Sequence, residues 1–240
     1  MDHPSPVLSV IIPVYNEERL VKASVEAMHA SLLARAIPFE IVLVNDGSKD
    51  ASPVLMDQLA ARLEGVRVRH QQNQGIGGAF RTGLTEARGE YCMLWPADML
   101  ATKEGLAPYT DSLGRADVIV GCRRQRLAYN WLMRINARIY PLLIRLLFGL
   151  RLRDVNWICV YRRAPLAALT LTQSGIPMLA EMLVRLRDRQ ASFLEIEVDM
   201  QVRTAGKPSA ARLVVMRRTL LGLLRFWLLW RREQKSATHT

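Results

Sequence analysis

The feature that most constrains the fold of this chain is a regular alternation of strand and helix patterns through its first half. Short apolar runs rich in β-branched residues predict buried strands, and the longer runs between them predict helices. The strands are predicted at residues 8–12, 40–44, 66–70 and 91–94, and the helices at 19–33, 53–63 and 76–87. Because this rhythm is typical of βαβ units, it predicts an α/β fold with a doubly wound, mostly parallel sheet and helices on both faces.

Polar segments directly follow three of the predicted strands. They read Pro13-Val14-Tyr15-Asn16-Glu17, Val44-Asn45-Asp46-Gly47-Ser48 and Pro96-Ala97-Asp98. In an open α/β sheet, ligands bind outside the carboxyl ends of the strands. We therefore expect a binding site where these three segments meet.

The second half of the chain is richer in arginine and leucine. We predict a helix at 106–113, strands at 117–121 and 193–202, and amphipathic helices at about 130–150 and 212–232. On the last helix, a heptad stripe of Arg218, Arg225 and Arg232 lies opposite a largely apolar face formed by Met216, Leu220, Leu223, Leu224, Trp227 and Trp230. We divide the chain into one domain with two halves, residues 1–122 and 123–210, and a basic helical tail at 211–240.

The composition indicates an ordered protein with an anionic partner. Half of the 240 residues are hydrophobic, which excludes a disordered chain, and the net charge is +11. Nucleic acid, anionic lipid headgroups and phosphorylated substrates would each match this charge. No helix-turn-helix, zinc-finger, RRM or KH motif is present, so we do not expect nucleic acid to be the partner.

The cysteines and the apolar stretches indicate in which compartment the chain functions and whether it spans a membrane. An odd number of widely spaced cysteines, Cys92, Cys122 and Cys159, predicts reduced core thiols in a cytosolic protein. The first six residues lack the basic and apolar regions of a signal peptide. Arginines interrupt the apolar stretches at 139–150 and 213–230, so we predict no membrane-spanning helix.

The three polar segments and their order resemble those of family 2 glycosyltransferases with the GT-A fold. The resemblance is strongest to the polyprenyl-phosphate branch that includes dolichol-phosphate mannose synthase. A fourth segment, residues 73–83, matches the family pattern N-x-G-x-G-x-A-x-x-x-G. Phe80 stands where the dinucleotide-binding fingerprint needs its third glycine, which disfavours a nicotinamide or flavin site. The resemblance implies inverting transfer of a sugar from a GDP- or UDP-sugar to a lipid phosphate.

The resemblance also implies a donor site at the sheet edge. It assigns nucleotide binding to Pro13, Tyr15, Glu17, Asp46, Gly75, Gly77 and Ala97. Asp46 is expected to read the base, because a carboxylate accepts the imide N–H of uracil or an N–H of guanine. The family usually has a second aspartate where this chain has Asn45.

The segment that implies a metal departs further from the family pattern. Where the family commonly has D-A-D-x-Q, this chain has Pro96-Ala97-Asp98-Met99-Leu100, so one carboxylate remains. The resemblance implies that Asp98 is catalytic and binds Mg²⁺ or Mn²⁺ together with the donor diphosphate. One carboxylate, phosphate oxygens and water suit such a hard cation.

Basic residues of the second half match positions that the family uses for phosphates. The resemblance implies that Arg123 faces the donor diphosphate and that Arg134 meets the acceptor phosphate, both as catalytic residues. It places Arg203, Lys207 and Ser209 in the acceptor-phosphate loop. Planar guanidinium groups suit phosphate oxygens, which favours these assignments.

A lipid monophosphate acceptor changes the chemistry that catalysis needs. It is already anionic near neutral pH, so it needs no general base, whereas a saccharide hydroxyl does. Two alternatives stay open: transfer to a saccharide hydroxyl, and a catalytically weak protein that binds nucleotide or lipid phosphate. The acceptor and the two arginine-rich helices predict a cytoplasmic protein bound peripherally to the anionic inner face of the membrane. The alternatives are that the apolar helix faces pack on the protein's own core or on a membrane-spanning partner protein.

Overall fold

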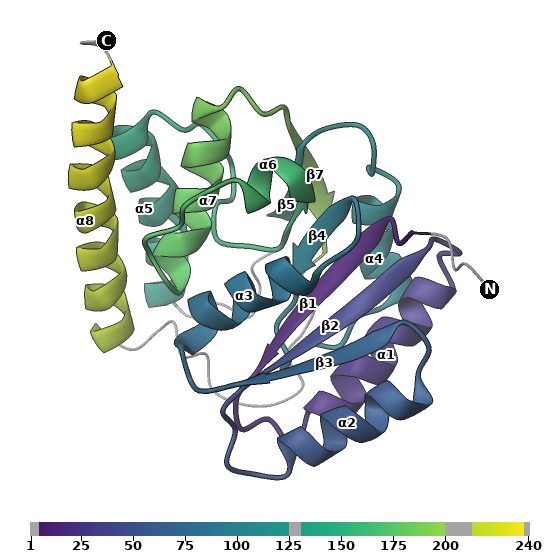
Figure 1. The fold of residues 1–240 in the computed structure, drawn as a ribbon. Helices are drawn as coiled ribbons and strands as arrows, with labels where there is room; N and C mark the ends of the chain where they lie inside the picture. Colours follow the sequence, from purple (N-terminus) through teal and green to yellow (C-terminus); the bar gives the residue numbers. More distant parts are fainter. Residues whose placement is uncertain (1–4, 125–130, 200–212, 238–240) are drawn as a thin grey trace.

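The protein folds around one seven-stranded sheet (Figure 1). The computed structural model describes residues 5–124, 131–199 and 213–237, with side chains from 139 and 217 onward in the helices that begin the last two segments. The strands are β1 (Leu8–Val14), β2 (Phe39–Asp46), β3 (Val66–Gln71), β4 (Tyr91–Leu94), β5 (Val118–Arg123), β6 (Cys159–Arg162) and β7 (Phe193–Val198). The helices are α1 (Val21–Leu33), α2 (Ser52–Arg62), α3 (Gly75–Glu86), α4 (Lys103–Thr110), α5 (Trp131–Phe148), α6 (Arg163–Ala167), α7 (Ile176–Asp188) and α8 (Leu213–Ala237).

Helices cover both faces of the sheet, and alternate strand residues face the two layers. Ile11 and Val44 belong to a core formed with α3, α5, α7 and α8. Val10 and Leu43 belong to the opposite core, formed with α1, α2 and α4 (Figure 1). This period of two along buried strands is what a sheet packed on both sides requires.

The strand order β3-β2-β1-β4-β6-β5-β7 confirms the predicted α/β class. All pairings are parallel except those of β6, which is antiparallel to both β4 and β5. The sequence did not predict β6. It is only four residues long, and α6 follows it without a turn, so its pattern is too short to recognise.

The helical tail is part of the core rather than a separate appendage. Leu223 and Phe226 on α8 are buried, and the Phe226 ring stacks on Phe148 of α5 with centroids 4.9 Å apart. A side chain at Gly222 would come within 2.7 Å of Pro177, so α8 crosses the start of α7 closely. Burial of Leu223 fits the predicted apolar face, but Leu220 and Leu224, which were predicted on that same face, are exposed.

The three cysteines are buried, as predicted. Cys92, Cys122 and Cys159 are buried and free, and burial raises the pKa of each thiol to about 12. They are therefore inert core residues. Among the helices of the described residues, none combines the length and the apolar character that crossing a bilayer demands.

Candidate functional site

The loops that follow β1 and β2 are joined by hydrogen bonds. The Asn16 N–H donates to Ser48 Oγ over 3.1 Å, and the Lys49 N–H donates to Asn16 Oδ1 over 2.8 Å. The Glu17 N–H donates to Ser52 Oγ over 2.9 Å. Asn16 has a positive φ of 55°, which asparagine tolerates better than most residues. Two of the sequence motifs therefore form one structural unit at the carboxyl edge of the sheet.

Asp46, the predicted base-reading residue, ends β2 inside this unit and is 3% exposed. Its Oδ1 accepts hydrogen bonds from Gln71 Nε2, 2.7 Å away, and from the Gln74 N–H, 2.8 Å away. Gln71 lies opposite Asp46 in the β2–β3 register. The predicted nucleotide residues Pro13 and Tyr15 stand on and just past the neighbouring strand β1, and Tyr15 is 47% exposed.

Asn45, which replaces the usual aspartate, makes contacts that a carboxylate could not make in the same way. Its Oδ1 accepts the Ser48 N–H over 2.9 Å, and its amide Nδ2 lies 2.9 Å from His70 Nδ1. His70 Nε2 in turn lies 3.0 Å from Asp57 Oδ1. An amide can donate to the imidazole and accept from the backbone at once. Asn45 thus links the end of β2 to the end of β3.

Asp98 lies on a tight turn after β4, and buried residues hold that turn in place. The indole of Trp95, which is 1% exposed, donates to the Met99 carbonyl over 3.0 Å. Ser24 on α1 donates to the same carbonyl over 2.9 Å. Ala97, another predicted nucleotide residue, is 5% exposed beside Asp98. The turn is therefore rigidly anchored, as a metal-binding carboxylate requires.

The single carboxylate of Asp98 suits a metal ion that binds together with the nucleotide-sugar. Among residues 5–124, 131–199 and 213–237, no three acidic, histidine or cysteine side chains gather to hold an ion. Mg²⁺ is often bound through one or two carboxylates and substrate phosphates, with water at its remaining positions. In the predicted site, Asp98 would supply such a carboxylate, and the diphosphate of a nucleotide-sugar would supply the phosphate oxygens.

The two predicted nucleotide-binding glycines differ in their surroundings. Gly75 begins α3 with a positive φ of 71°, and a side chain there would meet nothing within 4 Å. The N–H groups at such a helix start suit an anion. Gly77 is buried, and a side chain there would come within 2.7 Å of Ser174. Its small size serves close packing of α3 against the 170–175 segment.

Arg123, the predicted diphosphate residue, is 7% exposed and forms an ion pair with Asp154, which is 2% exposed. Its Nε and Nη2 donate to the two carboxylate oxygens over 2.7 and 3.0 Å. The guanidinium lies 4.6 Å from the centroid of the Trp157 ring. In the same motif, a side chain at Gly121 would collide with the Tyr109 hydroxyl, 2.1 Å away. The G-x-R segment is thus tightly integrated in the core.

The remaining predicted residues of the acceptor site stay predictions. Arg134 lies within α5, but its side chain is outside the described part of the chain. Arg203, Lys207 and Ser209 fall in 200–212, which lies outside the described residues. Gln71 and Trp95 are the residues of the site that sequence reasoning missed. The strand pattern ended at residue 70, one residue before Gln71.

Comparison with known proteins identifies the family. A model described as Glycosyl transferase family 2 matches residues 9–170, more than half of the chain. The chain therefore belongs to glycosyl transferase family 2, as the motifs predicted. The match covers all four motif segments of the first half and continues through α6.

Two similar proteins carry names that mention polyprenyl phosphates. The undecaprenyl-phosphate 4-deoxy-4-formamido-L-arabinose transferase of Pseudomonas aeruginosa is 31% identical over 186 residues, which cover 74% of this chain and 54% of the relative. The dodecaprenyl-phosphate galacturonate synthase of Rhizobium johnstonii is 30% identical over 152 residues, which cover 61% of this chain and 45% of the relative. The chain thus spans about half the length of these relatives.

Solved structures confirm the GT-A-like architecture. Glucosyl-3-phosphoglycerate synthase of Mycobacterium tuberculosis, in complex with Mn²⁺, UDP and phosphoglyceric acid, superimposes with a TM-score of 0.72. The match covers 92% of this chain and 78% of that one at 16% sequence identity. At this identity the likeness shows the shared fold, and the bound Mn²⁺ and UDP belong to that protein.

Proposed function

We propose that this protein transfers a sugar from a GDP- or UDP-sugar to a polyprenyl phosphate, inverting the anomeric centre. The observation that carries the proposal is the meeting of three motif segments at one sheet edge. Asp46 ends β2, and Tyr15 and Asp98 follow β1 and β4; the three strands are neighbours in the sheet. Ligands of open α/β sheets bind at this edge. The polyprenyl-phosphate transferases among the relatives support the acceptor class.

The proposed acceptor supplies its own nucleophile. A phosphate monoester is ionised near neutral pH, so one of its oxygens can attack the anomeric carbon without losing a proton to the protein. The acidic residue that follows α5, Asp154, is buried and engaged by Arg123, which makes it a poor candidate for a general base. The protein then needs to position two anionic substrates and stabilise the departing diphosphate.

Asp98 is the residue that we assign to metal binding. A bound Mg²⁺ or Mn²⁺ would act as a Lewis acid and neutralise charge on the departing diphosphate. The anchored turn supports this assignment, because Trp95 and Ser24 hold the backbone next to Asp98 in place. The N–H groups at the start of α3 provide further positive potential for phosphate oxygens.

Metal binding should depend on the nucleotide, because the protein contributes one carboxylate in this assignment. We expect Mn²⁺ to bind at least roughly tenfold more tightly in the presence of UDP or GDP than to the protein alone. Titration of Mn²⁺ by electron paramagnetic resonance measures this, with protein-free nucleotide solution as the reference. Equal affinity with and without nucleotide would show that the ion binds elsewhere.

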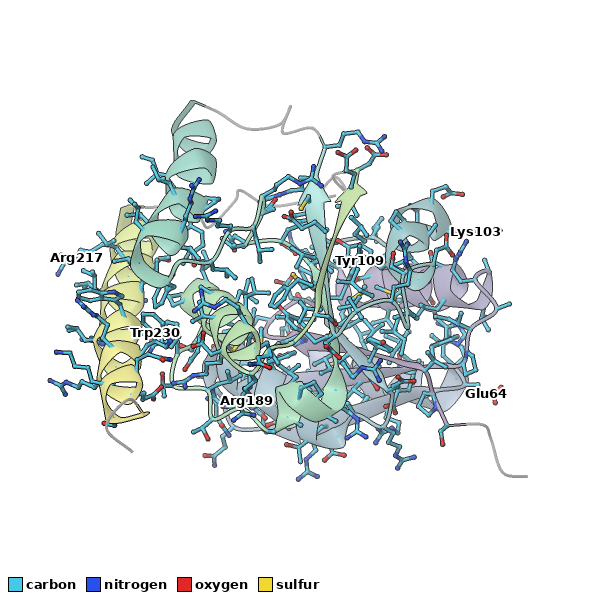
Figure 2. All side chains as sticks on the ribbon, turned by 90° about the horizontal axis from the view of Figure 1, so that it is seen from above. Glu64, Lys103, Tyr109, Arg189, Arg217 and Trp230 are labelled. Carbon is cyan, nitrogen blue, oxygen red and sulfur yellow. The ribbon has the colours of Figure 1, made fainter. Side chains whose placement is uncertain are left out.

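A lipid acceptor requires contact with a membrane surface, and we propose that α5 and α8 make it. Large apolar side chains are exposed on both helices: Ile139, Leu142 and Leu146 on α5, and Leu220, Leu221, Leu224, Leu228 and Leu229 on α8. Arg218, Arg225 and Arg232 are exposed on α8 as well. Figure 2 shows Arg217 pointing away from the body of the protein and Trp230 pointing toward it. Exposed leucines with flanking arginines are typical of helices that lie in a membrane interface.

Charge reversal on α8 should release the protein from anionic vesicles. We expect the triple variant of Arg218, Arg225 and Arg232 to glutamate to bind at least about 100-fold more weakly, because each basic residue near the surface contributes about 1 kcal/mol. Flotation with phosphatidylserine vesicles measures binding. Deleting α8 would be a poorer test because Phe226 is buried in the core.

The matched control reverses three exposed arginines that lie outside α5 and α8, namely Arg69, Arg88 and Arg115. It changes the net charge equally, so it should bind vesicles much more strongly than the α8 variant. Equal loss in both variants would mean that only bulk charge matters. No binding of the native protein at low salt would contradict membrane contact through this face.

Mass spectrometry tests the proposed function directly. The protein is incubated with a bacterial lipid extract and a panel of UDP- and GDP-sugars, and the expected product is a lipid monophosphate that carries one sugar. Transfer to a saccharide hydroxyl remains the second candidate, because family 2 membership alone does not determine the acceptor. Nucleotide release without a lipid-linked product would favour that candidate.

A further inference from the structure

The carboxylate of Asp46 offers one oxygen to a ligand rather than two. Its Oδ1 already accepts hydrogen bonds from Gln71 Nε2 and the Gln74 N–H, which occupy both lone pairs of that oxygen. Within the described part of the chain, no donor reaches Oδ2. Oδ2 is also accessible to solvent. Among the described residues, Arg162 Nε is the one side-chain polar atom that is both buried and without a hydrogen bond, so Oδ2, which has no hydrogen bond, is not fully buried.

The surrounding backbone keeps Oδ1 of Asp46 hydrogen-bonded and leaves Oδ2 available to a ligand. Gln71 is fixed opposite Asp46 by the β2–β3 register. A side chain at Gly47 would come within 2.8 Å of the Asn73 backbone nitrogen, so the loops after β2 and β3 are already in close contact. Rotating the carboxylate by half a turn only exchanges its two equivalent oxygens. Asp46 therefore cannot present both oxygens without losing hydrogen bonds in a buried site, which is costly.

The bases of nucleotide-sugars differ in what they need from such a carboxylate. Guanine presents two adjacent donors on its pairing edge, N1–H and N2–H, which match both oxygens of one carboxylate. Uracil presents a single donor, N3–H, between two carbonyl acceptors, so one free oxygen satisfies it. Cytosine has an acceptor at the ring nitrogen and would place it against the negative charge. The single free oxygen of Asp46 fits uracil best.

We propose that Gln71 is a specificity-determining residue that makes the site select uridine nucleotides over guanosine nucleotides. It does so by occupying the oxygen of Asp46 that guanine would use. This inference rests on the proposed function, in which Asp46 reads the base of the donor. It names a residue outside the sequence motifs and narrows the donor from GDP- or UDP-sugars to UDP-sugars.

Calorimetry on the full chain with Mn²⁺ and UDP, GDP or CDP tests the inference. We expect UDP to bind at least about tenfold more tightly than GDP, because the loss of one hydrogen bond to a charged group costs that much or more. Gln71→Met keeps the length of the side chain but removes the donor. It should therefore reduce the ratio of UDP affinity to GDP affinity at least about threefold, mainly through tighter GDP binding. The matched control is Gln72→Met, at the exposed neighbouring position, and it should leave the ratio unchanged.

The possible failures are distinguishable from one another. GDP binding as tight as UDP binding in the native protein would overturn the uridine selectivity while leaving sugar transfer intact. An unchanged ratio in a folded Gln71→Met variant would overturn the role of Gln71. No binding of any of the three nucleotides would overturn both this inference and the proposed function. The native UDP-to-GDP ratio decides the selectivity even if the Gln71 variant does not fold.

Discussion

Replacing Asp98 with alanine is expected to lower the rate of sugar transfer at least roughly 100-fold, equivalent to about 2.7 kcal/mol of transition-state stabilisation. Asp98 is the carboxylate that we assign to the metal, and a metal at the diphosphate is worth several kcal/mol of charge stabilisation. The melting temperature should change little, because Asp98 is only partly buried on a turn that Trp95 and Ser24 hold independently. A radiolabelled transfer assay and thermal melts measure the two effects.

A second carboxylate in the segment between β4 and β5 provides the control. Glu104 is exposed in the first turn of α4, so Glu104→Ala should keep the transfer rate within about twofold. Chelation with EDTA should abolish transfer by the native protein. If Asp98→Ala retains most of the native rate with Mn²⁺, or if EDTA has no effect, the metal assignment is wrong.

Removing Asp154 should destabilise the protein by about 3 to 5 kcal/mol, because Arg123 would be left buried without its bidentate partner. The two side chains are 2% and 7% exposed, so solvent cannot replace the lost contact easily. At roughly 2 to 4 °C per kcal/mol for a domain of this size, Asp154→Ala should lower the melting temperature by at least about 6 °C.

A surface pair of the same residue types is the matched control for Asp154. Asp111 pairs with Arg35 but its side chain is 62% exposed, so Asp111→Ala should cost no more than about 1 kcal/mol. Similar melting temperatures for the two variants would contradict the buried ion pair. The double change of Arg123 to Met and Asp154 to Leu should regain most of the stability. Its transfer rate then measures what Arg123 contributes to catalysis apart from folding.

The first half of the chain was predictable because local signals and tertiary structure agree there. β1 and β2 are buried on both faces and read as continuous apolar runs, and each ends in a polar motif at the ligand-binding edge. The family matched by the chain confirms the resemblance that those motifs carried. That Tyr15, Asp46 and Asp98 lie at the same edge of the sheet could therefore be predicted from the order of the motifs and the geometry of parallel sheets.

The features that sequence reasoning missed depend on contacts between distant residues. Gln71 contacts a carboxylate 25 residues away, and Arg123 pairs with one 31 residues away. No local pattern encodes either contact. β6 is a strand because it pairs with β4 and β5 on both sides, not because of its four residues alone. The tail helix was predicted, but which of its leucines are buried depends on how α8 crosses α7.

The acceptor dependence of transfer tests the central claim most directly. The purified protein, a UDP-sugar and Mn²⁺ are incubated in parallel with undecaprenyl phosphate, undecaprenol and a soluble saccharide, and products are measured by mass spectrometry. Because an ionised phosphate needs no general base, we predict transfer to undecaprenyl phosphate, with formation of a lipid monophosphate sugar and release of UDP. Transfer to undecaprenol or the saccharide at a comparable rate, or bound nucleotide without transfer to any acceptor, would contradict the account.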